Sequence, residues 1–156
     1  MNKRIDFNLV QPAAYDALDG LDQFVNASSI DAVLKELIRI RASQINGCAY
    51  CVDAHSRDAK KIGVPEQKIF LVSAWREAGD IFSAEERLVL QMTEEITLIQ
   101  QQGLSDTVYE KAIEHFGEEG TAQLIMAVTT INAWNRIGVT TKLHPVKRNS
   151  STVKPV

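Results

Sequence analysis

Apolar residues recur along most of the chain at the three- and four-residue spacing of an amphipathic helix. No segment shows the sustained alternation of apolar and polar residues, bounded by turn dipeptides, that indicates a strand. The clearest stripe follows Ser28 and Ser29, either of which can cap the helix, and Asp31 suits its first turn. The members of this stripe are Ile30, Val33, Leu34, Leu37 and Ile38. The pattern predicts an all-α fold.

Residues that cap or break helices predict the bounds of the elements. Pro12 opens a first helix, Asn46-Gly47 ends the second, and Gly63 closes a third that begins near Cys48. A serine followed three residues later by a glutamate forms a capping box for the fifth helix. The predicted ranges are about 12–25, 28–45, 48–63, 65–77, 83–103, 105–117 and 119–136. We therefore expect about six or seven helices.

Composition and charge describe an ordinary globular chain. Its 156 residues are 45% hydrophobic and 24% charged, with a formal net charge of -3, so no excess of basic residues suggests a nucleic-acid partner. No stretch has the eighteen or so apolar residues of a membrane span, and charges interrupt the first thirty positions. We expect a cytoplasmic protein with no membrane partner, one domain over 1–146 and a flexible tail over 147–156.

The two cysteines of the chain form a Cys-x-x-Cys pair, Cys48 and Cys51, at a predicted helix start. Unpaired N–H groups in the first turn stabilise a thiolate, and the neighbouring thiol can close a disulfide. His55 follows Cys51 by four residues, so both sulfurs and the imidazole share one helical face. In the cytoplasm such a pair is more often catalytic or metal-binding than structural. Thiol redox chemistry is the leading hypothesis.

Glu36 lies at the border of the apolar stripe of its helix, where its carboxylate can point into a crevice. Other interpretations stay open. Glu36 can be a solvated partner of Arg39 at i+3, and both cysteines can be small core residues. Zinc binding would require four ligands, and the chain has no second Cys-x-x-Cys pair, so we expect no metal.

A polar run ends the last predicted helix, which is otherwise apolar. It contains Asn132, Asn135 and Arg136 beside Trp134. Aromatic residues on helices usually belong to the core, and buried amides need hydrogen-bond partners. We therefore expect either a polar network or a subunit interface at this end of the helix.

The segment around the cysteines resembles the AhpD-like alkylhydroperoxidases of the carboxymuconolactone decarboxylase superfamily. Their signature, Glu-x11-Cys-x-x-Cys-x-x-x-His, matches at all four positions, which are Glu36, Cys48, Cys51 and His55. The similarity spans nearly the whole chain and continues in three further segments, 74–77, 82–87 and 131–136. The resemblance implies an AhpD-like all-helical domain that assembles as a homo-oligomer, usually a trimer or hexamer.

Two features set the chain apart from members of that superfamily. The best-studied alkylhydroperoxidases of this type have a histidine directly before the second cysteine, and here that residue is Tyr50. A proton-relay role at that position is therefore absent or altered. The true carboxymuconolactone decarboxylases act without a Cys-x-x-Cys pair, so the presence of Cys48 and Cys51 argues against decarboxylation.

The expected activity is thiol-dependent reduction of a small-molecule hydroperoxide, with an antioxidant role. Glu36 would be the proton acceptor and orienter, and His55 would relay a proton from Cys51. Cys51 would be the peroxidatic cysteine and Cys48 the resolving one, because Cys51 is one helical turn from His55. The opposite assignment stays open, since Cys48 lies closer to the helix terminus.

The expected partners are a hydroperoxide and an external dithiol reductant, either a thioredoxin-like or a lipoyl protein, and no cofactor is required. Two other functions use the same residues. The first is a protein-disulfide reductase or electron-transfer adaptor for a peroxiredoxin or lipoyl partner. The second is a non-catalytic oligomer whose cysteines sense oxidation or bind zinc.

Overall fold

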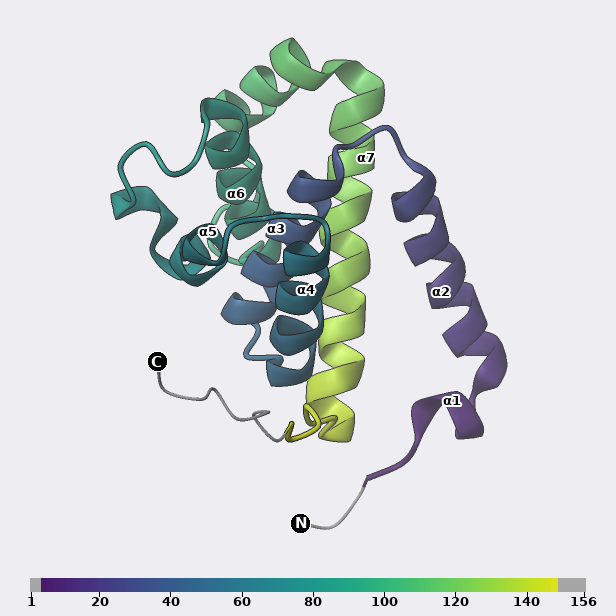
Figure 1. Cartoon of the computed structure of the whole chain (residues 1–156). Helices are drawn as coiled ribbons and strands as arrows, with labels where there is room; N and C mark the ends of the chain where they lie inside the picture. The colour runs from purple at the N-terminus through teal and green to yellow at the C-terminus, as the bar shows by residue number, and fades with distance from the viewer. Residues whose placement is uncertain (1–3, 149–156) are drawn as a thin grey trace, which may run out of the picture.

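The computed structural model describes residues 4–148, and every regular element in that range is a helix. Figure 1 shows the longest helix, α7, with α2 along one side and α3 and α4 on the other. The all-α prediction is confirmed for the described residues. In chain order the elements are α1 (Phe7–Val10), α2 (Pro12–Ala27), α3 (Ala32–Ile45), α4 (Ala49–Lys61), α5 (Glu66–Leu71), the 3-10 helix η1 (Val72–Glu77), α6 (Ala84–Thr97) and α7 (Asp106–Thr141).

Helix α3 lies between two hydrophobic clusters. Leu34, Ile38 and Ala42 belong to the cluster that α3 shares with α2, α6 and α7. Leu37 and Ile40 belong to the cluster that it shares with α4, α5, η1 and α6. A helix packed on both sides at interior density has little freedom to move. The side chains that α3 carries at the border between the two clusters are therefore held in fixed positions.

The N-cap of α3 differs from the prediction. Asp31 caps the helix, and its carboxylate accepts a hydrogen bond from the Val33 N–H at 2.7 Å. Ser28 donates its hydroxyl hydrogen to the Val25 carbonyl at 2.6 Å instead. The hydroxyl of Ser29 is bound to a glutamine of α7. Both serines therefore serve the approach to the helix rather than its cap.

Several helix ends also differ from the sequence pattern. The predicted helix over 65–77 is a short α-helix followed by a 3-10 helix, and α6 ends at Thr97, before Gly103. The two predicted helices after Ser105 are joined in α7, with Gly117 at a φ of 68° as the break between them. The second part continues past Arg136 to Thr141, and α1 is an additional short helix.

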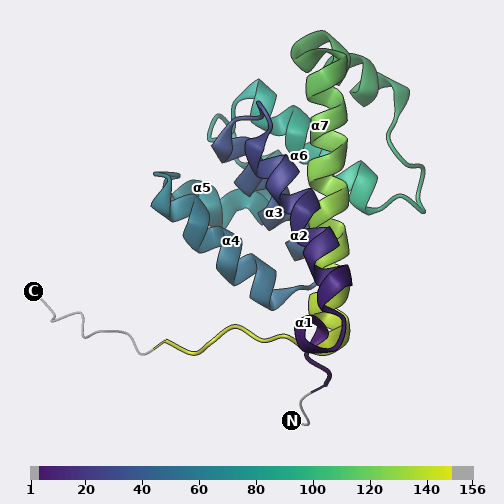
Figure 2. The ribbon, with the colours of Figure 1, turned by 90° about the vertical axis from the view of Figure 1, so that its right-hand side faces the viewer.

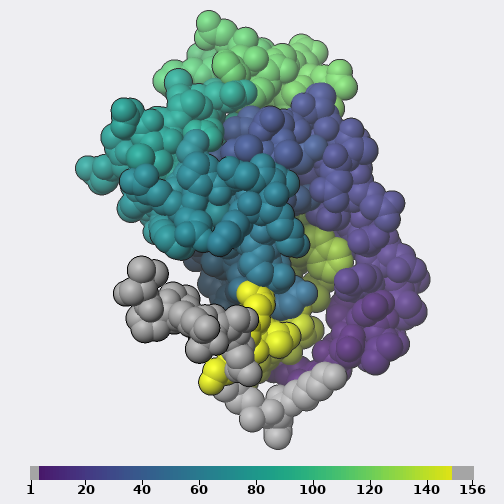
Figure 3. Space-filling model, viewed as in Figure 1, coloured from purple at the N-terminus to yellow at the C-terminus, as the bar shows by residue number. Residues whose placement is uncertain are grey.

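The chain leaves the end of α7 and runs below α4 toward its described end, as Figure 2 shows. Of the predicted tail, 147–156, only the first two residues lie within the described range, and the rest lie outside it. Figure 3 shows part of α7 at the surface between α4 and α2. None of the helices in residues 4–148 combines the length and apolar character that a bilayer crossing requires.

Candidate active site

A disulfide occupies the first turn of α4. Cys48 is the N-cap, and its sulfur accepts a hydrogen bond from the Cys51 N–H at 3.4 Å. The two sulfurs are bonded to each other, with 5.3 Å between the Cα atoms. Both residues are buried, Cys48 at 1% and Cys51 at 6% exposure. Because the first turn of a helix has N–H groups without backbone partners, it favours a thiolate once the disulfide is reduced.

The turn that leads into the disulfide is fixed by a polar network with α7. Gly47 has a φ of 68°, in the left-handed region that glycine enters without steric cost. The Asn46 amide donates to the side-chain oxygens of Asn132 and Asn135, at 2.9 Å each. Asn135 in turn donates to the Ser43 hydroxyl at 2.9 Å. The polar run at the end of the last helix thus forms a network within the chain.

Gly138 of α7 packs against the disulfide. A Cβ atom at this position would lie 3.2 Å from the sulfur of Cys48 and 3.8 Å from the sulfur of Cys51. The backbone of α7 therefore approaches the sulfurs as closely as it does because residue 138 has no side chain. Sequence reasoning missed this residue, because a single glycine inside a helical pattern does not reveal which distant residue it contacts.

Glu36 and His55 form a hydrogen-bonded pair between α3 and α4. Nδ1 of His55 lies 3.0 Å from Oε2 of Glu36. Glu36 is buried at 7% exposure, and its other oxygen accepts a hydrogen bond from Arg39 at 2.7 Å. His55 lies one helical turn after Cys51 on α4. The structure thus pairs Glu36 of α3 with His55 of α4, on the helix whose first turn carries the two cysteines.

The more ordinary interpretation of Glu36 is correct in one respect and wrong in another. Glu36 does pair with Arg39 at i+3, as that interpretation expects. It is not solvated, however, because both residues are buried at 7% and 8% exposure. Tyr50, which directly precedes the second cysteine, is exposed at 38%. The buried carboxylate contacts the imidazole and the guanidinium at the same time.

Metal binding has a candidate cluster in the part of the chain that the structure describes. Glu36, His55 and Asp58 place one ligand atom each within 4.8 Å of one another. Two carboxylates and an imidazole would suit a divalent ion. Both carboxylates already have cationic partners, however, since Arg39 pairs with Glu36 and Lys61 pairs with Asp58 at 2.6 Å. Those charges oppose the binding of a cation.

Asp53 ties the segment after α7 to the helix of the disulfide. Its carboxylate accepts two hydrogen bonds from the Arg148 guanidinium, one of them at 3.0 Å. Arg57, one turn along α4, lies 3.5 Å from the same carboxylate. The hydrogen bond from Arg148 lowers the pKa of Asp53, with a smaller contribution from Arg57. The described end of the chain is therefore anchored two residues beyond Cys51.

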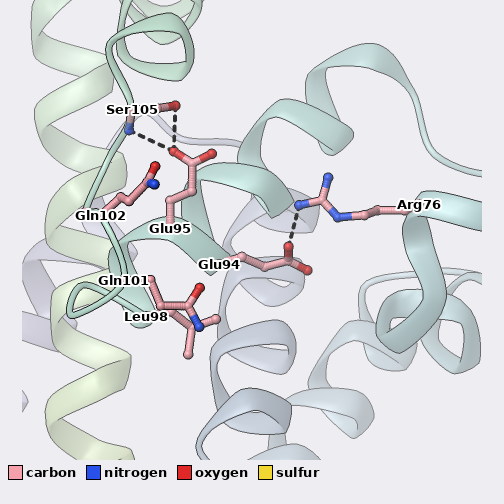
Figure 4. Close-up of a pocket in the computed structure, with 8 residues that line it drawn as sticks. Arg76, Glu94, Glu95, Leu98, Gln101, Gln102 and Ser105 are labelled. Atoms are coloured by element: carbon pink, nitrogen blue, oxygen red, sulfur yellow. Dashed lines mark hydrogen bonds and ion pairs between the residues drawn. The ribbon is translucent and has the colours of Figure 1, made fainter.

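A second polar region lies around a pocket of about 390 Å³, which is shown in Figure 4. Glu94 accepts hydrogen bonds there from the Trp75 indole at 2.7 Å and from Arg76 at 2.6 Å. Arg41 of α3 binds the same carboxylate at 2.8 Å. Burial by itself would raise the pKa of Glu94, but these partners outweigh it and the pKa is lowered. Because neither cysteine lines this pocket, it is separate from the disulfide.

The disulfide in the first turn of α4 and the buried Glu–His pair between α3 and α4 comprise the four residues on which the resemblance to AhpD-like proteins rests. The sequence profile of the carboxymuconolactone decarboxylase family matches residues 12–95. The chain belongs to this family and is an AhpD-like member of it.

Two relatives support this membership. Uncharacterized protein YdfG of Bacillus subtilis (strain 168) is 38% identical over 139 residues, which are 89% of this chain and 94% of that protein. A protein of unknown function from Agrobacterium tumefaciens, described as a candidate AhpD antioxidant defence protein, has a crystal structure that covers 94% of this chain and 100% of its own. It shares 36% identity with a TM-score of 0.89.

The same fold is also found in the debrominase Bmp8. Its apo structure covers 86% of this chain and 72% of its own, with a TM-score of 0.76 and 20% identity. At that identity the likeness concerns the fold alone. One fold can carry different chemistries, so the reaction has to be argued from the site.

Proposed function

We propose that the protein is a thiol-dependent hydroperoxidase that reduces a small-molecule hydroperoxide with the electrons of Cys48 and Cys51. The observation that carries this proposal is the 3.0 Å contact between His55 and the buried Glu36. An imidazole that donates its Nδ1 hydrogen to a carboxylate keeps Nε2 free as a base. A base oriented in this way one turn from a cysteine is the arrangement that activates a thiol.

The first step oxidises one cysteine and reduces the peroxide. His55 takes the proton of the Cys51 thiol, and the thiolate attacks the distal oxygen of the peroxide. The O–O bond breaks, the sulfur becomes a sulfenic acid, and the alkoxide leaves and takes the proton from the imidazolium. Cys51 is the better candidate for this role because it is more exposed than Cys48, at 6% against 1%, and lies nearer His55 along α4.

The second step closes the disulfide that the structure contains. The Cys48 thiol attacks the sulfur of the sulfenic acid, an S–S bond forms, and hydroxide leaves with the proton of Cys48 as water. An external dithiol, thioredoxin-like or lipoyl, then reduces the disulfide by thiol–disulfide exchange and is itself oxidised. One peroxide is reduced for each dithiol consumed.

Single-turnover oxidation tests the proposal. The reduced protein is mixed with hydrogen peroxide or an alkyl hydroperoxide, and the remaining thiols are counted over time. His55→Asn and Glu36→Gln should each slow the reaction by about 10²-fold or more, the usual size of a general-base contribution. His115→Asn is the matched control, because His115 lies 3.3 Å from Glu85 in an exposed pair. Equal rates in wild type and His55→Asn would contradict the proposal.

Sulfenic acid trapping assigns the two cysteines. The Cys48→Ser variant should accumulate a sulfenic acid on Cys51, because the resolving thiol is missing. If a stable sulfenic acid forms only in Cys51→Ser, the two roles are reversed.

The adaptor function is the second candidate, and it uses the same two cysteines. The burial of both sulfurs, which are at most 6% exposed, hinders a protein dithiol and a protein disulfide alike, so the rates with peroxide and with disulfides have to separate the two functions. An adaptor should react quickly with disulfides and poorly with peroxide. Stoichiometric zinc in the purified protein, or thiols with an ordinary pKa near 8.5, would instead favour the non-catalytic oligomer.

We also propose that the protein assembles as a homotrimer or homohexamer. Large apolar side chains are exposed on α2 and near both ends of the described chain, among them Phe24 at 50%, Leu9 at 79% and Leu143 at 49%. Where such groups form one contiguous patch, they mark a surface that contacts a partner. Sedimentation analysis at several concentrations would give the mass, and a monomer throughout would contradict the proposal.

A further inference from the structure

Arg39 links the Glu–His pair to α2. It is buried at 8% exposure on α3, one turn after Glu36. Nη1 donates to Oε1 of Glu36 at 2.7 Å. Nη2 donates to the Asp22 carboxylate at 3.1 Å and to the Asn26 side-chain oxygen at 2.6 Å. Both acceptors of Nη2 belong to α2, so a continuous chain of hydrogen bonds runs from α2 through Arg39 and Glu36 to His55.

A second cation holds the same end of α2 without touching the Glu–His pair. Lys35 donates to the backbone carbonyls of Asn26 and Ser28, at 2.9 and 3.0 Å. Burial, together with the positive charge of Arg39, lowers the pKa of Lys35. Lys35 and Arg39 thus share the task of anchoring α2, but only Arg39 also contacts Glu36. This difference allows the structural and chemical roles of Arg39 to be separated.

The charges around Glu36 explain what Arg39 contributes. From α4, Glu36 faces His55 and Asp58, whose carboxylate lies within 4.8 Å of the pair and repels a second negative charge. From α3, Arg39 supplies the positive charge in direct contact, while Asp22 of α2 orients the far side of the guanidinium. A buried carboxylate without a cationic partner tends to take up a proton. Arg39 therefore balances the charge of the Glu36 carboxylate and fixes the orientation in which its other oxygen meets Nδ1 of His55.

We propose that Arg39 is a positioning residue of this site, which holds the Glu36 carboxylate aimed at His55, and that α2 takes part in the site through Asp22 and Asn26. The inference rests on the proposed thiol chemistry but not on peroxide as the substrate. The planar fork of arginine serves two helices at once, which a lysine in the same place could not do with equal geometry.

Alkylation of the reduced protein by iodoacetamide across pH tests the inference, because it reports thiolate formation and needs no peroxide. In Arg39→Met the acid limb of the rate profile should move to higher pH, because a Glu36 carboxylate that is no longer held against His55 stabilises less well the imidazolium that faces the thiolate. Arg39→Lys should shift it less, because it keeps the charge. Asp22→Asn should produce a smaller shift in the same direction, because it loosens the guanidinium.

Lys35→Met is the matched control, because it removes an anchor of α2 and leaves Glu36 untouched. An unshifted profile in this variant, with a shift in Arg39→Met, is the expected result. If both variants shift equally, or if Arg39→Met keeps the wild-type profile, Arg39 has only a structural role and the inference is overturned. Should Arg39→Met fail to fold, the alkylation profiles of Arg39→Lys and Asp22→Asn are compared with that of Lys35→Met in its place. Shifts no larger than that of Lys35→Met would overturn the inference. Slow peroxide oxidation of the wild type would count against the proposed function only.

Discussion

Gly138 shows how a single missing side chain shapes the redox site. Gly138→Ala would place a methyl group 3.2 Å from the Cys48 sulfur, closer than ordinary van der Waals contact. We expect the oxidised protein to lose about 1–3 kcal/mol of unfolding free energy, the usual cost of overpacking. Urea denaturation of the oxidised protein measures this loss.

The control for that substitution is Gly20→Ala in α2. A Cβ atom at Gly20 would meet nothing within 4 Å. Alanine should therefore stabilise this helix by about 0.5–1 kcal/mol through its lower backbone entropy. Equal stability changes in the two variants would show that the close approach of α7 to the disulfide has no energetic consequence.

Glu94 should contribute stability that depends on pH. Its pKa is lowered in the folded protein, so its contribution is complete above the pKa of the unfolded chain and is lost as the pH falls through the folded value. Because its three partners are left facing a neutral amide, Glu94→Gln should cost about 2–3 kcal/mol at pH 7. The loss should shrink as the pH is lowered below about 4.

Thermal or urea unfolding at several pH values measures this dependence. Glu110→Gln, on an exposed position of α7, is the control and should leave the stability nearly unchanged. A penalty for Glu94→Gln that is the same at pH 3 and pH 7 would contradict the charge argument.

At the scale of helices, the sequence predicts features that depend on residues within one turn of each other. It does not predict features that depend on contacts with a distant helix. The capping box of Ser83 and Glu86 was predicted and is present, because both of its hydrogen bonds lie within one turn. The cap of α3 was predicted wrongly. Ser29 is bound to Gln123 of α7, a partner 94 positions away that sequence spacing does not reveal.

The same distinction holds for the candidate site. Cys48, Cys51 and His55 share a face of α4 because their spacing of three and four residues fixes it. The burial of Glu36 could be expected from the sequence, because this residue borders the apolar stripe of its helix. The link from Arg39 to α2 and the approach of Gly138 depend on how separate helices pack, and no local pattern indicates either.

Asp31→Ala tests the corrected cap. The carboxylate accepts a hydrogen bond from the Val33 N–H at 2.7 Å, so its removal should cost about 1 kcal/mol of unfolding free energy. Asp16→Ala, in the exposed interior of α2, is the control and should be neutral or slightly stabilising. If Ser28→Ala proves more costly than Asp31→Ala, the helix begins earlier than the structure indicates.

At the scale of the molecule, the two described ends of the chain are held by two different helices, α7 and α4. Arg4 donates to the Thr140 carbonyl at 2.5 Å, and Arg148 binds Asp53 of α4. Arg148→Ala should therefore raise the pKa of Asp53 toward its ordinary value, since the hydrogen bond from Arg148 is the main cause of its lowering. Carboxyl chemical shifts followed through an acid titration measure this change.

A lysine substitution separates charge from geometry in that contact. Arg148→Lys keeps the positive charge but loses the paired hydrogen bonds, so it should give an intermediate pKa for Asp53. An Asp53 titration that is identical in wild type and Arg148→Ala would show that the segment does not rest on α4 in solution.

A fragment of this chain needs α7 in order to fold, because α7 covers core residues of α3 and α6. A truncated protein ending at residue 95, where the family profile stops, would retain all four signature residues. It would also lack the helix that covers α3 and α6, leaving Ile38, Val89 and Met92 open to water. Trimming the chain to the part that the family profile matches would yield an insoluble or molten product rather than a smaller folded domain.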